Sequence, residues 1–303
     1  MKKTVYKTCD SIINCQENKI LLFKKNGLSV MECKKCNHRF AKIDNIENHT
    51  EQVYSDYYFF GDQQGYPDYL DNKDILYKAG LRYAKIVAKH TNPGKVLDVG
   101  CAAGFILKGF EKSGWSCYGI EPNDRMASYG RNELNLNITT GSLETFQANE
   151  KFDLVNLIQV IGHFYDLDKA IKNISDLLTT NGLVLIESWN RKSIYARIMG
   201  KGWHEYIPPS VIHWFSDKTL TQIFNFYGFQ LIAKGYPLKR INISHALSIL
   251  KGKSSNSVFK RRFINLLNKT VGKLTLIYPP LDLKWYIFRK RNITIAGHDM
   301  GNI

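Results

Sequence analysis

The chain has 303 residues, of which 44% are hydrophobic, and a formal net charge of +15. This composition is typical of a globular protein with a substantial core, and the length allows one large domain with appended modules or two small domains. No apolar run approaches the roughly 20 residues of a membrane span, and the first residues lack the apolar segment of a secretion signal. We therefore expect a cytoplasmic protein.

Four of the six cysteines lie near the start of the chain. Cys33 and Cys36 have the spacing of a metal knuckle, in which two thiolates around a tight turn reach one zinc ion. Cys9 and Cys15 form a less regular upstream pair. We predict a zinc-ribbon-like module over 1–45 in which these four thiolates form a closed, structural zinc site. The alternative is a ribbon that keeps its hairpin without the metal.

The segment 46–90 follows this module. Seven aromatic residues within 54–70 suggest a cap over a pocket, and the alternative is that they pack the segment against the main domain. A helix is expected over 73–89. His38 and His49, near the boundary with the first module, are expected at the surface.

From residue 96 onward, short apolar runs alternate with amphipathic stretches. Such alternation predicts βαβ units and a mostly parallel sheet in an α/β, Rossmann-like fold. Strands are expected near 96–99, 117–121, 137–140, 152–158, 182–188 and 229–233, and helices near 103–113, 124–134, 167–178 and 216–227. A seventh, antiparallel strand is expected at the sheet edge over 283–288. Residues 236–282 then form an insertion in a domain that spans 91–296.

The stretch 96–122, VLDVGCAAGFILKGFEKSGWSCYGIEP, is the most informative part of the chain. Gly100 and Gly104 permit a tight turn from a buried strand into a helix. Glu121 follows Gly100 by 21 residues, close to the spacing at which a carboxylate binds a ribose diol. Asp98, just before the turn, disfavours a pyrophosphate and favours a cationic cofactor that carries an amino group. The pattern therefore predicts a nucleoside-cofactor site other than a dinucleotide site.

This D-V-G-C-A-A-G turn resembles the first motif of the class I S-adenosylmethionine-dependent methyltransferases. The resemblance implies S-adenosylmethionine as the cofactor. In parallel α/β sheets the ligand lies beyond the carboxyl ends of the strands, so the chemistry is expected in the loops after the first, second, fourth and fifth predicted strands. Ser142 and Leu143 are expected to contact the adenine, and Gln159 to face the cofactor. The implied cofactor-binding residues are Asp98, Gly100, Cys101, Ala102, Gly104, Glu121, Pro122, Ser142, Leu143 and Gln159.

Later motifs narrow the resemblance to the ubiquinone O-methyltransferase-like group. They are E-S-W-N at 187–190 and H-W-F-S at 213–216, and the similarity covers about residues 9–236, with a weaker fit near 283–290. Members with an N-terminal zinc ribbon include sugar C-methyltransferases. Trp189 stands where the motif has proline. Ile212 stands where the sugar C-methyltransferases have a glutamate before an active-site histidine, which weakens the case for methylation of a keto-sugar carbon.

Methyl transfer to a hydroxyl or to an enolisable carbon requires removal of a proton, and histidine suits that task. His163, after the fourth predicted strand, and His213 are the candidate catalytic bases. For each of them the alternative is a packing role. His204 and His245 are weaker candidates.

Residues 234–292 contain fourteen Lys and Arg and the single acid Asp282, a net charge of +13. An amphipathic basic helix is expected over 259–274. It either packs on its own domain, or contacts a membrane surface or a lipid-linked substrate over 256–276, or covers an anionic group.

Three functions stay open at this point. The favoured one is methylation, at oxygen or carbon, of a small molecule or of a sugar or glycan intermediate, in surface-polysaccharide or secondary-metabolite synthesis. A nucleic-acid methyltransferase is disfavoured, because L-I-Q-V-I-G-H at 157–163 lacks the N/D-P-P-Y pattern of amino methylases. The third is a non-catalytic binding protein that keeps the fold. The sequence does not indicate an oligomeric state.

Overall fold

The computed structural model describes residues 19–43, 53, 59, 69–237, 239–242, 275–278 and 282–291. The chain divides into two compact units, one comprising Met1–Gly235 and Asp282–Ile303 and the other Tyr236–Leu281. Within the smaller unit, β11 (Lys239–Asn242) pairs antiparallel with β12 (Thr275–Tyr278). The predicted basic helix, and with it the predicted membrane contact, lies outside the described residues.

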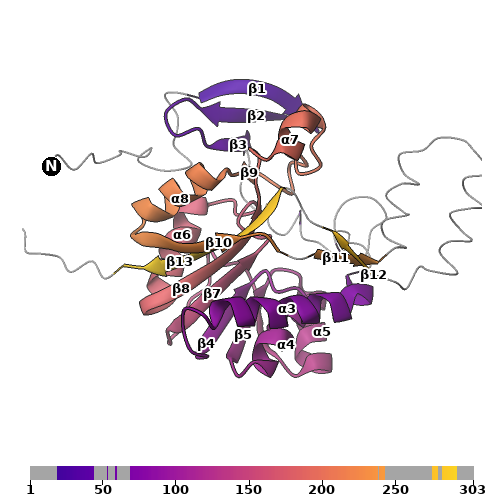
Figure 1. Cartoon of the computed structure of the whole chain (residues 1–303), viewed down its shortest axis with the longest axis vertical. Helices are drawn as coiled ribbons and strands as arrows, with labels where there is room; N and C mark the ends of the chain where they lie inside the picture. Colours follow the sequence, from indigo (N-terminus) through magenta and orange to yellow (C-terminus); the bar gives the residue numbers. More distant parts are fainter. Residues whose placement is uncertain are drawn as a thin grey trace, which may run out of the picture. The chain divides into compact units, whose positions relative to one another are not determined.

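A seven-stranded sheet forms the centre of the larger unit, in the order β10-β13-β8-β7-β4-β5-β6 (Figure 1). Its strands are β4 (Lys95–Val99), β5 (Ser116–Glu121), β6 (Asn137–Thr140), β7 (Phe152–Ile158), β8 (Leu178–Trp189), β10 (Phe229–Gly235) and β13 (Leu283–Lys290). Strands β4 to β8 pair in parallel. The predicted α/β, Rossmann-like sheet is therefore confirmed.

The last strand, β13, is antiparallel to both neighbours, β8 and β10, as predicted for its direction. Its predicted edge position is wrong, because it lies between these two strands. Three successive side chains, Tyr286, Ile287 and Phe288, are almost completely buried. Successive residues of a strand face opposite sides of the sheet, so such a run requires cover on both faces and favours an interior strand.

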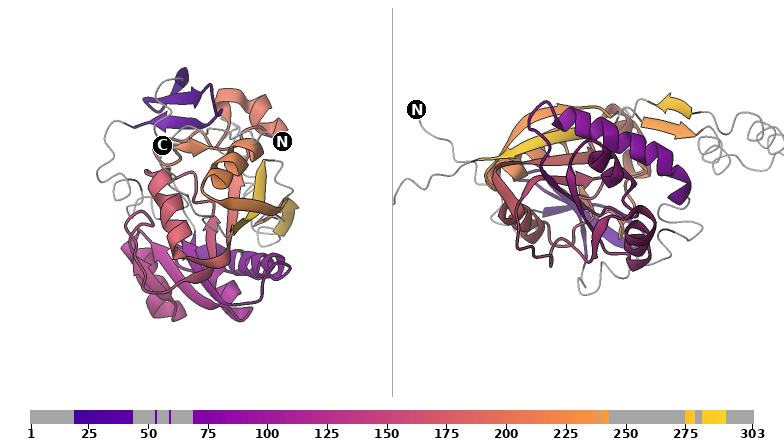
Figure 2. Two further views of the ribbon diagram at one scale, coloured as in Figure 1. Left: turned by 90° about the vertical axis from the view of Figure 1, so that its left-hand side faces the viewer. Right: turned by 90° about the horizontal axis from the view of Figure 1, so that it is seen from below.

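Helices cover both faces of this sheet (Figure 2). One layer contains α3 (Lys73–Val87), α4 (Phe105–Lys112) and α5 (Asp124–Leu134), and the other contains α6 (Leu167–Leu177) and α8 (Asp217–Phe226). The alternation of strand side chains builds both cores, since Val96 packs in the layer of α3 while Leu97 packs in the layer of α6. None of the helices in the described ranges is both long and apolar enough to cross a membrane.

Helices α3 and α4 approach each other through glycines. A Cβ atom added at Gly109 would lie 2.6 Å from the backbone nitrogen of Leu81 and from the carbonyl oxygen of Tyr77. A Cβ atom added at Gly80 would lie 2.1 Å from the carbonyl oxygen of Ile106. Because the obstructing atoms belong to the backbone, neither contact can relax by a change of rotamer.

We expect Gly109→Ala to lower the free energy of unfolding by about 1–3 kcal/mol, measured by urea denaturation. The direction of the change separates a steric clash from helix propensity, because alanine in an unobstructed helix would raise the free energy of unfolding by about 1 kcal/mol relative to glycine. Gly202→Ala is the matched control, since the nearest atom to its added Cβ lies 4.0 Å away. A Gly109→Ala protein as stable as the wild type would show that the two helices can separate without cost.

The N-terminal module is a four-stranded antiparallel sheet in the order β1-β2-β3-β9. Its strands are β1 (Lys19–Lys25), β2 (Leu28–Cys33), β3 (Arg39–Lys42) and β9 (His213–Trp214). Asn26 and Gly27 form the first hairpin with positive φ angles of 48° and 78°, as in a type I′ turn. The fourth strand comes from the segment between β8 and α8, so residues far apart in sequence complete one sheet.

Candidate active site

The turn after β4 has three residues with positive φ, namely Gly100 (66°), Ala102 (48°) and Gly104 (84°). The backbone N–H groups of Gly100 and Cys101 donate to the carbonyl oxygen of Ile120, at 2.8 and 3.1 Å. A Cβ atom at Gly100 would lie 2.8 Å from the Val160 side chain. Ala102 adopts the left-handed conformation, which is uncommon for a residue other than glycine. This conformation holds the turn close to β5.

Glu121 ends β5 and is 3% exposed. Its carboxylate accepts hydrogen bonds from the backbone N–H groups of Ala102 and Asn123, each at 2.8 Å. Pro122 lies between the two residues that form this second contact. Burial raises the pKa of Glu121 to about 7, although the two backbone N–H groups oppose the shift. Glu121 thus ties the loops after β4 and β5 together and carries a charge that is costly in this environment.

Asp98 lies beside Glu121, on the neighbouring strand, and is 2% exposed. Burial, with a further contribution from the charge of Glu121, raises the pKa of Asp98 to about 7, while the side chain of Asn156 opposes the shift. None of the ion pairs among the described residues includes either carboxyl group. Two buried acids without a cation favour a positively charged ligand at this edge of the sheet.

The loop after β6 holds the predicted adenine contacts. Leu143 is 1% exposed, and its side chain packs in the core layer that contains Leu97. The Ser142 hydroxyl lies 3.3 Å from that of Thr145. The structure therefore places the Leu143 side chain in the core, and Ser142 and the loop backbone are the groups nearer the surface.

Gln159, directly after β7, has a positive φ of 59°. Both its backbone N–H and its side-chain amide donate to Glu187, to the carbonyl and the carboxylate respectively, each at 2.8 Å. The other carboxylate oxygen of Glu187 accepts the hydroxyl proton of Tyr83 on α3. Burial, followed by the charge of Glu187, raises the pKa of Tyr83 well above its ordinary value, so Tyr83 remains a donor. These hydrogen bonds hold Gln159 at a positive φ, which is uncommon for a residue other than glycine.

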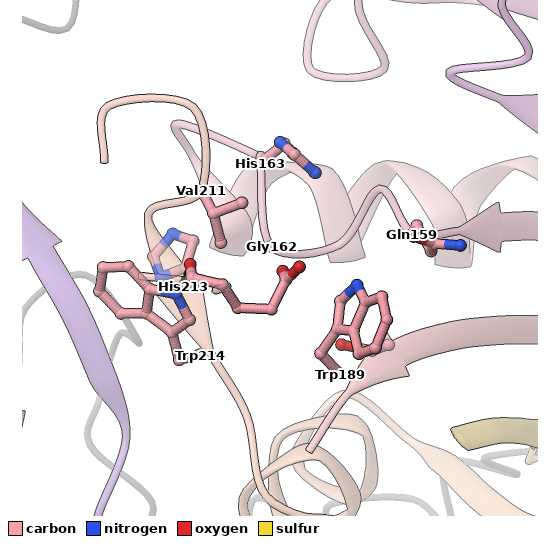
Figure 3. A pocket seen from close by; sticks show the side chains of 9 residues that line it. Gln159, Gly162, His163, Trp189, Val211, His213 and Trp214 are labelled. Atoms are coloured by element: carbon pink, nitrogen blue, oxygen red, sulfur yellow. Dashed lines mark hydrogen bonds between the residues drawn. The ribbon is translucent and has the colours of Figure 1, made fainter. Parts of the chain in front are cut away.

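A small cavity lies next to Gln159 (Figure 3). It brings together residues from the loop after β7, the end of β8 and β9, and both candidate bases are among them. Its lining residues are Gln159, Gly162, His163, Ser188, Trp189, Glu205, Val211, His213 and Trp214. Two indole rings and several polar side chains are the mixture expected of a pocket for a small polar molecule.

His163 has a defined orientation in this cavity. Its Nδ1 lies 2.8 Å from the carbonyl oxygen of Ser210. A carbonyl oxygen only accepts, so Nδ1 carries the proton and Nε2 is the basic nitrogen of the neutral ring. This is the protonation pattern that a general base needs.

His213 makes a different contact, with the N-terminal module. Its Nδ1 lies 3.0 Å from Nε2 of His38, and the two side chains are buried. The prediction that His38 lies at the surface is wrong: it is 1% exposed, because the knuckle turn folds it inward against β9. Burial, followed by the charges of His213 and Arg191, lowers the pKa of His38 well below its ordinary value.

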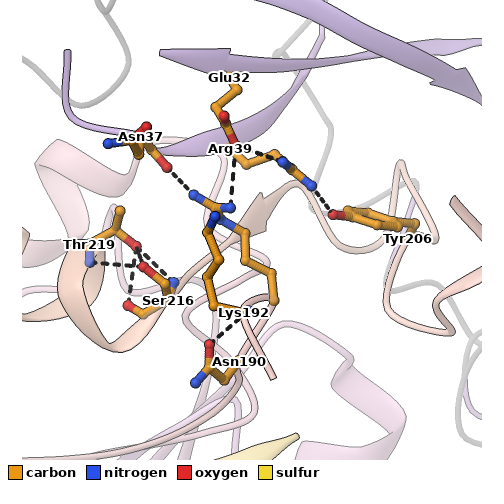
Figure 4. A network of polar contacts seen from close by, with 9 residues as sticks. Glu32, Asn37, Arg39, Asn190, Lys192, Tyr206, Ser216 and Thr219 are labelled. Carbon is orange, nitrogen blue, oxygen red and sulfur yellow. Dashed lines mark hydrogen bonds and ion pairs between the residues drawn. The ribbon is translucent and has the colours of Figure 1, made fainter. Parts of the chain in front are cut away.

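A polar network joins the N-terminal sheet to the loop after β8 (Figure 4). Arg39 donates to Glu32 through Nε and Nη2, at 3.1 and 2.7 Å, and Arg191 pairs with the same carboxylate at 3.3 Å. Arg191 also donates to the carbonyl oxygen of Asn37, and Arg39 donates to the hydroxyl of Tyr206. The module that contains His38 is therefore fixed against the loop after β8 through partly buried, charge-assisted bonds.

Cys33 and Cys36 lie at the knuckle turn, where Asn37 N–H donates to the Cys33 carbonyl at 2.8 Å. Across the part of the chain that the structure describes, no group of three or more histidine, cysteine or acidic side chains is arranged to hold a metal. Cys9 and Cys15 lie outside that part. The four-thiolate zinc site thus stays a prediction. The chain forms a tight turn at Cys33 and Cys36, as the spacing of these cysteines suggests.

Comparison with known proteins identifies the fold that carries this site. Residues 72–234, more than half of the chain, match the family model described as "Methyltransferase domain". The chain belongs to this family. The methyltransferase domain includes both buried acids, the Gln159 cluster and the two candidate bases.

Curated relatives are named ubiquinone biosynthesis O-methyltransferase. The one from Pelagibacter ubique is 27% identical over an alignment of 135 residues, and the match covers 38% of this chain and 56% of the relative. The one from Bradyrhizobium diazoefficiens is 26% identical over 128 residues, 37% of this chain and 51% of the relative. The chain thus matches about half the length of these relatives.

Among solved structures, the YcgJ protein from Bacillus subtilis is similar in fold to the methyltransferase domain. It has a TM-score of 0.50 and 17% identity, and the match covers 71% of this chain and 99% of that protein. At this identity the likeness concerns the fold alone, and it agrees with the predicted Rossmann-like sheet.

Proposed function

We propose that this protein transfers a methyl group from S-adenosylmethionine to a hydroxyl group of a small molecule. The observation that carries the proposal is the pair of buried acids, Asp98 and Glu121, which no cation balances among the ion pairs of the described residues. Membership of the methyltransferase domain family and the O-methyltransferase names of the relatives support the same reaction.

The chemistry of the donor set fits the cofactor. Glu121 has oxygen lone pairs beyond the two used by backbone N–H groups, and these suit a ribose diol. Asp98 offers negative charge to the amino and sulfonium groups of the methionine part. Ala102 and the flanking glycines allow the backbone of the turn to approach the ligand closely. When bound, S-adenosylmethionine supplies the electrophilic methyl group.

The cavity beside Gln159 is the proposed acceptor site. His163 removes the hydroxyl proton through Nε2, while its Nδ1–H stays bonded to Ser210. Gln159, held by Glu187, lies between the cofactor edge of the sheet and this cavity. The partly buried indole of Trp189 suits the face of a ring, so we include sugar hydroxyls, and hence a sugar or glycan intermediate, in the acceptor class.

The chain's residues accelerate the reaction mainly by alignment, because displacement at the methyl carbon needs the acceptor oxygen in line with the sulfonium. Methyl transfer forms one C–O bond, breaks one C–S bond and releases one proton, which His163 accepts. Neither the nucleic-acid nor the binding-protein alternative has an observation of its own among the described residues.

Two measurements test this function. Calorimetry with S-adenosylhomocysteine measures cofactor binding, and transfer of tritium from methyl-labelled S-adenosylmethionine to catechol or methyl α-D-glucopyranoside measures the reaction. Absence of binding by the wild type would contradict the proposal at its first step.

We expect His163→Gln to lower the rate of methyl transfer by about 10²–10⁴-fold and to leave the affinity for S-adenosylhomocysteine unchanged. The reason is that glutamine keeps a hydrogen bond to Ser210 and loses the basic nitrogen. The control is His90→Gln, in the turn after α3 and outside the cavity lining. Equal loss of transfer and of cofactor binding in His163→Gln would assign His163 a structural role instead.

A further inference from the structure

One polar side chain interrupts the apolar interior of β7. The strand has the sequence F-D-L-V-N-L-I over 152–158, and its residues 154–157 are completely buried. Asn156 is the polar residue among these four, and within the described part of the chain neither its amide nitrogen nor its amide oxygen has a hydrogen-bond partner. A buried amide without partners destabilises the fold, because it has given up its hydrogen bonds to water. Packing alone therefore does not account for an asparagine at this position.

The register of the sheet places Asn156 directly beside Asp98. Strand β7 runs parallel to β4 on one side and to β8 on the other, so that Asn156 lies opposite Asp98 on β4 and opposite Leu185 on β8. In-register residues of neighbouring strands project to the same face of a sheet. This face is the one that α3 and α4 cover, because Leu185 and Val96, two residues before Asp98, pack in that layer. Asn156 thus has an acid on one side and an apolar side chain on the other.

The chemistry of the two side chains fixes the direction of their interaction. A carboxylate only accepts hydrogen bonds, so the NH₂ group of Asn156 is the donor toward Asp98. Burial and the charge of Glu121 raise the pKa of Asp98 to about 7, and the Asn156 side chain opposes them by favouring the ionised carboxylate. The amide still lacks a hydrogen bond of ordinary geometry. Hydrogen bonds in active sites commonly become well aligned only when the ligand is bound.

We propose that Asn156 is a positioning residue for the cofactor, which donates a hydrogen bond to Asp98 and holds its carboxylate toward the positively charged methionine part of S-adenosylmethionine. This inference rests on the proposed function, because it takes Asp98 as a partner of the cofactor. Asn156 is completely buried beside Asp98, so it acts through that carboxylate. An amide is neutral and therefore stabilises the carboxylate without cancelling the negative charge that the cofactor requires, as a lysine or an arginine would.

Replacing Asn156 by leucine removes the donor and keeps a side chain of similar size. Calorimetry with two ligands separates the effects: S-adenosylmethionine has the charged methionine part, whereas 5′-deoxy-5′-methylthioadenosine is neutral and keeps the adenine and the ribose. We expect the affinity for S-adenosylmethionine to fall about tenfold or more, because a charge-assisted hydrogen bond is lost, and that for the neutral nucleoside to change less than about threefold. The midpoint of urea denaturation without ligand should stay the same or rise, since an apolar group replaces an amide without partners.

A double-mutant cycle tests whether Asn156 acts through Asp98. In the Asp98→Asn protein, the further change Asn156→Leu should alter the affinity for S-adenosylmethionine by less than about threefold. The matched control is Asn137→Leu, at an exposed position at the start of β6, away from the carboxyl ends of the strands. It should leave the affinities for both ligands unchanged.

Equal weakening of both ligands in Asn156→Leu would overturn the inference, because a damaged fold affects both. Unchanged binding of S-adenosylmethionine, or a tenfold loss that persists in the Asp98→Asn protein, would overturn it as well. Asn156→Val, which suits a strand, replaces the leucine variant if circular dichroism shows that variant to be unfolded. Failure of both variants to fold would assign the amide to the fold and also overturn the inference. A wild type that binds neither ligand contradicts the proposed function itself.

Discussion

Replacing Glu121 by glutamine is expected to weaken the binding of S-adenosylhomocysteine by at least about 100-fold, since each hydrogen bond to a charged group contributes about 1.5–3 kcal/mol. The carboxylate accepts from Ala102 N–H and Asn123 N–H and is the proposed partner of the ribose diol. A glutamine amide has one acceptor oxygen, so its NH₂ group must face a backbone donor. The loops after β4 and β5 then lose the hydrogen bonds that Glu121 makes between them, along with the ribose contact.

The measurement is calorimetry on the variant and on Glu133→Gln, a control that removes an exposed carboxylate from α5. Circular dichroism reports whether the sheet is intact. If Glu121→Gln binds S-adenosylhomocysteine as tightly as the wild type, the ribose-binding role assigned to Glu121 is wrong.

Replacing Asp98 by asparagine is expected to act in opposite directions on stability and on cofactor binding. The pKa of Asp98 is raised from 3.8 to about 7 in the folded protein, mainly by burial. An acid whose folded pKa is raised binds more protons when folded, so its contribution to stability is lost as pH rises from about 4 to about 7. Asparagine resembles the protonated acid and avoids this loss.

Urea denaturation of the cofactor-free protein should therefore show Asp98→Asn to be more stable than the wild type by about 2 kcal/mol at pH 8, and equal to it near pH 4. Calorimetry should show weaker binding of S-adenosylmethionine by about tenfold or more, because a cation loses its buried counter-charge. A variant that is less stable than the wild type at pH 8 would contradict the destabilising effect assigned to the buried charge of Asp98.

Much of the sheet could be predicted from the sequence, because parallel strands covered on both faces appear as short apolar runs between glycine turns. The ranges expected for β6 and β7 agree with the structure residue by residue. The position of β13 could not be predicted, since an apolar run specifies burial but not the neighbours with which it pairs. The two-residue strand β9 is too short to give any periodic signal.

The position of the two acids could also be predicted from the sequence, because Asp98 and Glu121 lie at or next to the ends of adjacent strands. The cavity was not. His163 acquires its tautomer from the carbonyl of Ser210, and His213 is buried against His38, which lies far away in sequence. Glu205 reaches the cavity through the fold of a loop. Hydrogen bonds to backbone carbonyls, and contacts between loops that are distant in sequence, produce no pattern of residue types from which they could be predicted.

We propose that two buried carboxyl groups, Asp98 near the end of β4 and Glu121 at the end of β5, bind a cationic cofactor. Calorimetric titration of the wild type with S-adenosylmethionine at pH 7, in buffers of different ionisation enthalpy, counts the protons exchanged on binding. With pKa values of about 7 for Asp98 and Glu121 in the free protein, ionisation of both upon binding predicts release of up to about one proton. Binding without proton release, or no binding at all, would contradict the account.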